Sequence, residues 1–153
     1  MGSWNIRRAI VLVLRLALGA VWLYAAYTKL KQPWLIFAMS IDSYKMLPQW
    51  AVLTIARTLP WLELALGVLF LFGLLLRYAA TLGAAILTVF FVAMVSAYAR
   101  GLNIDCGCFG PGDAISWRTF LRDGSLLAAA LALAWLSWKS VRQPSTSPTP
   151  SHG

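Results

Sequence analysis

Four long apolar stretches restrict the folds that this chain can adopt. They span residues 9–27, 55–76, 78–98 and 116–138. As helices, stretches of this length can cross the roughly 30 Å hydrocarbon core of a bilayer. Backbone N–H and C=O groups find no water partner there, so helices whose hydrogen bonds are internal are the economical solution. We therefore predict an all-α fold, an integral membrane four-helix bundle.

Composition and charge agree with a membrane protein. Hydrophobic residues make up 60% of the chain and charged residues only 12%, whereas about 25% of the residues in a soluble domain are charged. The formal net charge is +8, which by itself could suggest a nucleic-acid partner. The basic residues, however, stand singly at the ends of apolar runs and form no patch. We therefore expect the lipid bilayer to be the main partner and predict no nucleic-acid binding.

The ends of the bundle are less sharply marked. The strictly apolar part of the fourth run, 124–138, would rise only about 22 Å as a helix. We therefore extend it back through "SWRTFLRD", with Ser116 as N-cap and Arg118 and Arg122 reaching the interface. The membrane domain is expected to span 1–142. The Pro/Ser/Thr-rich tail 143–153 is expected to be disordered.

The first apolar run has features of a cleavable signal peptide, namely the preceding pair Arg7 and Arg8 and the following "LYAA". Its apolar core is longer than the roughly 7–15 residues typical of a signal peptide. We therefore predict that it is retained as a membrane helix.

Only two substantial connections exist, 28–50 and 100–115, and both must lie on one face if all four runs cross the bilayer. The positive-inside rule alone does not orient the chain. Lysine and arginine residues near the helix ends are nearly equal in number on the two faces: Arg7, Arg8, Arg77, Lys139 and Arg142 on one, and Lys29, Lys31, Lys45, Arg100, Arg118 and Arg122 on the other. The arginine pair before the first helix, and a cysteine pair suited to an oxidising compartment, favour cytoplasmic termini and outer loops. We predict a multi-pass protein of the bacterial inner membrane.

The first connection contains "PWLIFAMSIDSYKMLP", which is largely apolar. It predicts a short helix that lies in the interface or folds back over the outer face of the bundle. A loop anchored at headgroup level by Trp34, Tyr44 and Trp50 is the alternative.

The second connection contains both cysteines of the chain, in "DCGCFGPGD". A disulfide between Cys106 and Cys108 requires α-carbons within about 6.8 Å and therefore a bend at Gly107. So small a ring hardly restricts the unfolded chain, which argues against a structural role. Strained, exposed disulfides are typical of thiol exchange, and the glycine- and proline-rich sequence that follows should keep the sulfurs accessible. We interpret the pair as redox-active.

Two other interpretations of the cysteines stay open at this point. They could be inert or form a static disulfide, or they could bind a metal. Zinc usually takes four ligands, and the chain adds only His152, in its tail, to the two thiolates. A closed zinc site would therefore need two copies of the chain, although two thiolates alone suit Cu(I). We assign no metal ligands and leave an oligomer open.

Charged residues near the outer face supplement the pair. Glu63, near the outer end of the second helix, is costly in lipid unless it is paired or functional, and Lys29 at the end of the first helix is its expected partner. The pair could pin two helices or take part in proton transfer near the cysteines. Asp105 should disfavour the thiolate of Cys106, which makes Cys108 the expected attacking sulfur.

With these residues in view, the chain resembles the DoxX-like membrane proteins, and within them the methylamine-utilisation MauE group. The resemblance covers most of residues 10–138 and rests on "GAVWLYAAYTKLKQP", "PWLELALGVLFLFG" and, most specifically, "DCGCFG". It implies a four-helix membrane protein that acts with a thioredoxin-like partner to form or isomerise disulfides of exported enzymes, including methylamine dehydrogenase. It implies Cys106 and Cys108 as the active pair, with Asp105, Gly107, Phe109 and Gly110 around them. It implies no individual role for Lys29 or Glu63.

The electrons of such a pair must pass to another molecule, because the chain has no further cysteine. We expect exchange with a soluble thioredoxin-like domain on the same face and no resident cofactor, with a membrane quinone as the alternative acceptor. The chain would then be a thiol–disulfide oxidoreductase or an accessory subunit of one. The rival functions are a non-catalytic scaffold subunit with a static disulfide loop and a thiolate metal-handling protein.

Overall fold

The computed structural model describes residues 2–109 and 112–141. These residues form five helices: α1 (Gly2–Leu30), α2 (Trp34–Ser43), α3 (Gln49–Phe72), α4 (Leu76–Ala99) and α5 (Trp117–Val141). The four long helices, α1, α3, α4 and α5, are long and apolar enough to cross a membrane. No strand occurs among the described residues. The predicted all-α fold with four membrane-spanning helices is confirmed.

The helix ends differ from the expected ranges for local reasons. α3 was expected to begin at residue 55 but begins at Gln49, directly after Pro48. Pro48 is the N-cap and has an extended backbone (φ −67°, ψ 153°). The helix ends at Phe72, and its C-cap, Gly73, has a φ of +69°, in the left-handed region that favours glycine. The turn into α4 therefore lies at 73–75, and Arg77, which was expected in this turn, belongs to the first turn of α4.

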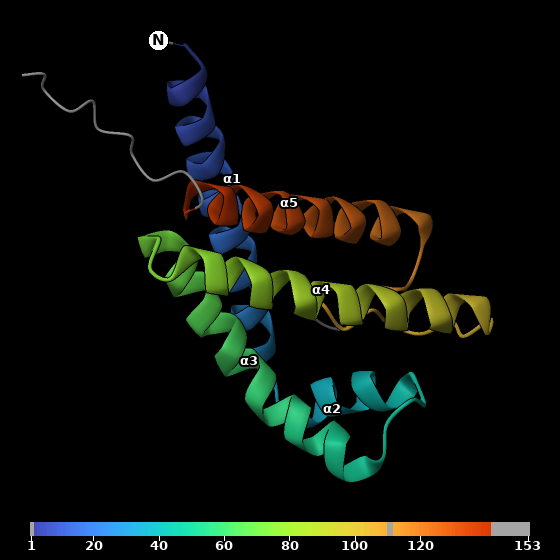
Figure 1. Cartoon of the computed structure of the whole chain (residues 1–153). Coiled ribbons are helices and arrows are strands. Elements are labelled where there is room, and N and C mark those ends of the chain that lie inside the picture. Colours follow the sequence, from blue (N-terminus) through green and yellow to red (C-terminus); the bar gives the residue numbers. More distant parts are fainter. Residues whose placement is uncertain (1, 110–111, 142–153) are drawn as a thin grey trace, which may run out of the picture.

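The four long helices share one core. α1 packs along α3, α5 packs along α4, and α1 also contacts α5 (Figure 1). Small side chains on α4 and α5 let the helix backbones approach closely, as is common between helices in membranes. The buried core residues are Leu18, Trp22, Leu66, Phe70, Ala79, Ala80, Ala84, Ala130 and Leu133.

The first connection folds as the predicted short helix, so the alternative of a plain loop is wrong. α2 lies beside the first half of α3 (Figure 1), and Phe37 and Ala38 pack against Val52, Ala56 and Leu59. Tyr44, expected as a headgroup anchor if the connection were a loop, is instead buried.

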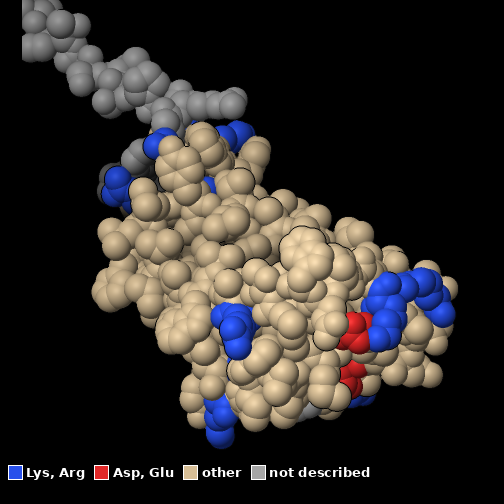
Figure 2. All heavy atoms as spheres, turned by 90° about the horizontal axis from the view of Figure 1, so that it is seen from below, with Lys and Arg blue, Asp and Glu red and all other residues tan. Residues whose placement is uncertain are grey.

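The surface of the bundle is suited to lipid. All four long helices expose large apolar side chains, for example Val13, Phe72, Val89 and Leu121. Figure 2 shows a face that is mostly neither acidic nor basic, with the charged side chains in a few separate places. Exposed apolar area of this extent is typical of a membrane interaction surface.

The two long connections meet in the structure. Arg100, at the end of α4, donates a hydrogen bond to the Tyr44 carbonyl at 2.6 Å, and the Tyr44 hydroxyl donates to the Cys106 carbonyl at 2.9 Å. The segment after α2 is therefore fastened to the cysteine loop, which agrees with the prediction that both connections lie on one face.

Candidate functional site

The cysteines lie in the loop between α4 and α5, which is folded back on itself. Asp105 and Ala114 form an isolated antiparallel bridge. The Cys106 amide donates to the Asp113 carbonyl at 2.7 Å, and the Gly112 amide donates to the Asp105 carboxylate at 2.9 Å. Local hydrogen bonds thus fix the backbone that carries the thiols. Gly110, expected to support the pair, lies outside the described residues.

Gly107 makes the predicted bend between the cysteines. Its φ is +73°, a conformation that residues with a side chain rarely adopt. A Cβ at this position would lie 3.2 Å from the Cβ of Ser40 on α2. Glycine is therefore required here both by the backbone conformation and by the close approach of α2.

The two thiols are close together but differ in exposure. Both cysteines are free, and their sulfurs and a carboxylate oxygen of Asp123 all lie within 4.8 Å of one another. Cys108 is half-buried, whereas Cys106 is only 2% exposed. The prediction that both sulfurs are accessible is wrong for Cys106, because the end of α2 and Tyr44 pack against this part of the loop.

Asp123, in the second turn of α5, is the carboxylate that contacts the thiols. The Cys106 thiol donates to its Oδ2 at 3.5 Å and the Cys108 thiol at 3.8 Å. Arg122 donates to Oδ1 of Asp123 at 2.9 Å and pairs with Asp113 at 2.8 Å. Asp105, which was expected to disfavour the Cys106 thiolate, accepts a hydrogen bond from the Gly112 amide.

Sequence reasoning missed Asp123, although a signal was present. It directly precedes the apolar run 124–138, where an acidic residue is costly unless it is paired or functional. Arg122, expected to reach the interface, is held instead by the two aspartates.

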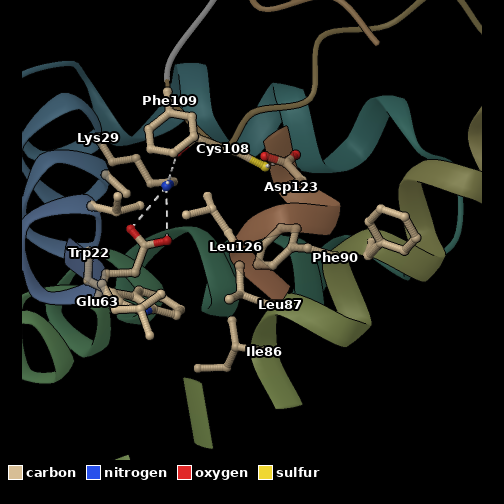
Figure 3. A pocket seen from close by; sticks show the side chains of 14 residues that line it. Trp22, Lys29, Glu63, Ile86, Leu87, Phe90, Cys108, Phe109, Asp123 and Leu126 are labelled. Atoms are coloured by element: carbon tan, nitrogen blue, oxygen red, sulfur yellow. Dashed lines mark hydrogen bonds and ion pairs between the residues drawn. The ribbon is translucent and has the colours of Figure 1, made fainter. Parts of the chain in front are cut away.

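Lys29 and Glu63 form the predicted ion pair. The Lys29 ammonium lies 2.9 Å from Oε1 and 3.0 Å from Oε2 of Glu63, and both residues are buried. Lys29 also donates to the Cys108 carbonyl at 2.6 Å. Figure 3 shows its nitrogen between Glu63 and the cysteine loop. A cation–dipole contact therefore links the ion pair to the backbone of the thiol segment.

The ion pair lies further along α3 than the sequence suggested. Glu63 comes 14 residues after Gln49, the first residue of α3, which is about 21 Å along a helix. Lys29 is nearly the last residue of α1. The end of α1 is thus level with the second half of α3, and the cysteine loop must reach into the bundle to contact Lys29.

A cavity of about 50 Å³ lies beside the ion pair and Cys108. Lys29, Glu63, Cys108 and Asp123 provide its polar lining, and Phe109 and Trp22 are among its apolar walls (Figure 3). Phe109 is held by the Tyr24 ring, with ring centres 5.8 Å apart, and by the Arg122 guanidinium 4.5 Å from its ring centre.

An apolar groove of about 620 Å³ also borders the loop. α2, α3 and α4 form it, and Cys106 and Gly107 belong to its lining. The two cysteines therefore border different spaces: Cys108 lines the small cavity beside the ion pair, and Cys106 lines the large apolar groove.

The surroundings of the loop oppose ionisation of two of its groups. The hydrogen bond with the Cys106 side chain, followed by burial and by the negative charge of Asp123, raises the pKa of the Cys108 thiol well above its usual value. Burial likewise raises the pKa of Tyr44. The Cys108 thiol and the Tyr44 phenol are therefore protonated at neutral pH.

The donor atoms of Cys106, Cys108 and Asp123 are close enough to share a metal ion. Among the described residues no further His, Cys, Asp or Glu joins this group, whereas structural zinc takes four protein ligands. His152 lies outside the described residues. The group is thus incomplete as a closed zinc site within this part of the chain.

Comparison with known proteins identifies the family. The family model described as methylamine utilisation protein MauE matches residues 7–136. The chain belongs to the MauE family. The resemblance to the MauE group inferred from "DCGCFG" is thereby confirmed.

Curated MauE proteins are similar to this chain over different lengths. The methylamine utilization protein MauE of Paracoccus denitrificans is 34% identical over 137 residues, 88% of this chain and 73% of the relative. The Methylorubrum extorquens MauE is 35% identical over 119 residues, 73% of this chain and 61% of the relative. This chain thus spans less than two thirds of the Methylorubrum protein. No solved structure matches the chain.

Proposed function

We propose that this MauE-family chain is a membrane-bound thiol–disulfide exchange protein whose active pair is Cys106 and Cys108. The observation that carries the proposal is the contact of both thiols with one buried carboxylate oxygen, that of Asp123. Two sulfurs within 4.8 Å of each other can form a disulfide after a small shift of the loop. A disulfide that encloses a single residue has little value as a cross-link.

The different exposure of the thiols supports a division of roles. Cys108 is half-buried and Cys106 is buried. Cys108 is therefore the sulfur that forms a mixed disulfide with a partner, and Cys106 resolves it. We take the partner to be a thioredoxin-like protein and the client to be an exported disulfide-containing enzyme of the methylamine dehydrogenase type. The relatives' names suggest that the biological role is methylamine utilisation.

The location follows from the same proposal. We place both termini in the cytoplasm and the cysteine loop outside the bacterial inner membrane, where exported enzymes form their disulfides. The meeting of the two long connections at Tyr44 and Cys106 supports a common face for them.

Trapping of the partner tests the proposal. Cys106→Ser should leave Cys108 able to form a mixed disulfide that cannot be resolved, visible after acid quenching as a higher-mass band that reductant removes. Cys108→Ser should trap much less, because Cys106 is buried. The static scaffold would be supported instead if neither variant gave a band and if exported disulfide-containing enzymes matured normally in a Cys106→Ser/Cys108→Ser strain.

Two further outcomes concern the other candidates. Stoichiometric Cu(I) or zinc in the protein purified without chelator, lost in the double serine variant, would favour metal handling. Oxidation of the reduced, detergent-solubilised protein by a short-chain quinone would favour a quinone as electron acceptor. The apolar groove that Cys106 lines supports the quinone alternative.

A further inference from the structure

We infer that Asp123 is the catalytic base that takes the proton of the Cys106 thiol when Cys106 resolves a mixed disulfide on Cys108. This inference rests on the proposed function, and it adds a role for a residue to which the sequence comparison gave none. Its basis is the hydrogen bond from the Cys106 thiol to Oδ2 of Asp123, 3.5 Å long and buried.

Cys106 needs such a base because its surroundings exclude water. The residue is 2% exposed and Asp123 is 7% exposed. A thiol attacks a disulfide only as the thiolate. A buried thiol must therefore pass its proton to a neighbouring group.

Asp123 is the acidic residue available for this transfer. All five acidic residues of the chain lie in its described part, and the other four pair with groups other than the thiols. Those pairs are Asp42 with Lys45, Glu63 with Lys29, Asp105 with the Gly112 amide, and Asp113 with Arg122. Among these acidic residues, only Asp123 accepts hydrogen bonds from the thiols.

Arg122 holds Asp123 in place for this role. It donates to Oδ1 at 2.9 Å and more weakly to Oδ2 at 3.4 Å. Oδ1 is thereby engaged, and Oδ2 faces the sulfurs. The Arg122 charge is shared with Asp113 at 2.8 Å, which leaves Asp123 incompletely neutralised.

In the resolving step, the Cys106 proton moves to Oδ2 of Asp123, and the resulting thiolate attacks the Cys108 sulfur. The Cys106–Cys108 bond forms and the bond between Cys108 and the partner's sulfur breaks. The pair thereby loses two electrons. The partner, whose disulfide reacted with Cys108 to form the mixed disulfide, gains them and is reduced to its two thiols. The thiolate that leaves Cys108 takes up a proton. In the opposite direction Asp123 returns its proton to Cys106.

The pH dependence of this step involves every charged or titratable group around Asp123. α4 contributes none to the cavity beside it, where its residues are Ile86, Leu87, Phe90 and Phe91. The groups from α1, α3, α5, the cysteine loop and the segment after α2 are Lys29, Glu63, Arg122, Asp113, Cys106, Cys108 and Tyr44.

A coloured aromatic disulfide separates the two steps. Reduced protein in detergent is mixed with one equivalent of a dithiobis-nitrobenzoate reagent. Attack by Cys108 releases the first coloured thiolate, and resolution by Cys106 releases the second. In Asp123→Asn the second phase should slow by roughly 100-fold at neutral pH, as expected for loss of a general base, and should recover as the pH rises.

The first phase should respond in the opposite sense, which a merely structural role would not produce. The Asp123 charge disfavours the Cys108 thiolate, so Asp123→Asn should leave the first phase unchanged or make it faster. Asp113→Asn is the matched control: it also removes a carboxylate from Arg122, but one that contacts no sulfur. Its second phase should stay close to that of the wild type.

The outcomes separate the two proposals. Equal second phases in Asp123→Asn and Asp113→Asn overturn the role of Asp123 while leaving the exchange reaction intact. If the wild-type protein gives no second phase, or Cys106→Ser keeps one, the proposed function itself fails. If Asp123→Asn does not fold, Asp123→Glu provides the test. It moves the carboxylate by one methylene and should change the rate and pH profile of the second phase only. An unchanged second phase would overturn the inference.

Discussion

Cys106 and Cys108 are separated by one residue, yet their environments differ. The left-handed Gly107 lets the chain bend so that both thiols reach the same oxygen of Asp123. Cys106 borders the apolar groove, whereas Cys108 borders the small cavity beside the Lys29–Glu63 ion pair. A single glycine therefore gives two neighbouring thiols different access to reagents.

The rate at which Cys108 reacts with alkylating reagents should depend on pH, and Cys106 should set the pH range because it affects the pKa of the Cys108 thiol. The pKa of the Cys108 thiol is raised chiefly by its hydrogen bond with Cys106. Between pH 7 and pH 9 it should therefore react with iodoacetamide more slowly than an ordinary cysteine, whose pKa is about 8.5. In Cys106→Ala the pKa should fall and the rate at pH 8 should rise, as measured by mass spectrometry of the alkylated peptide.

The sign of the linked stability follows from the same shift. A thiol whose pKa is higher in the folded than in the unfolded protein stabilises the fold below the unfolded pKa, and this contribution declines as the pH rises above about 8.5.

An alkylation rate of Cys108 in Cys106→Ala that is equal to or below that of the wild type at pH 8 would contradict the hydrogen bond as the cause of the raised pKa.

Among the elements, α1, α3 and the cysteine loop are joined by one buried charged contact. Lys29 comes from α1, Glu63 from α3, and the Cys108 carbonyl from the loop. Removing one partner of a buried ion pair leaves an uncompensated charge and costs about 3–5 kcal/mol. The contact therefore both holds two helices together and anchors the active loop.

Exchange of the two charges separates these roles. Lys29→Glu and Glu63→Lys should each sharply lower the yield of folded protein in detergent, and the double variant should recover more than either. Glutamate at position 29 cannot donate to the Cys108 carbonyl, so the double variant should still alkylate Cys108 faster than the wild type.

The exposed Lys31, two residues along the same helix end, provides the control. Lys31→Glu should change neither the yield nor the alkylation rate. Single Lys29 and Glu63 variants that fold as well as Lys31→Glu would remove the ion pair from the stability of the bundle.

In the whole molecule, the two long connections converge on one site, although 62 residues separate Tyr44 from Cys106. α2 covers the first half of α3, and Tyr44 fastens the end of this cover to the cysteine loop. The thiols are thus enclosed by both connections.

The proposed topology can be tested with single cysteines on a Cys106→Ser/Cys108→Ser background. Asn103→Cys in the exposed part of the cysteine loop should react in intact cells with a maleimide that does not cross the inner membrane. Ser147→Cys in the tail should react only after the membrane is permeabilised. The reverse pattern would invert the orientation.

The sequence by itself determined the membrane fold, because apolar runs of this length have few alternatives in lipid. It also determined the cysteine pair, its bend at glycine, and the pairing of Lys29 with Glu63, because a buried charge restricts its partners strongly. These features depend on local sequence or on the high cost of one unpaired group.

Only the tertiary structure decided which groups surround the thiols. The burial of Cys106, the contact of Asp123 with both sulfurs and the Lys29 hydrogen bond to the loop depend on how far α3 extends past the end of α1 and where α2 folds back. Helix length and packing set these distances jointly, and no residue pattern within a single segment encodes them. Asp105, next to Cys106 in the chain, therefore hydrogen-bonds Gly112, while Asp123 from another helix reaches the sulfurs.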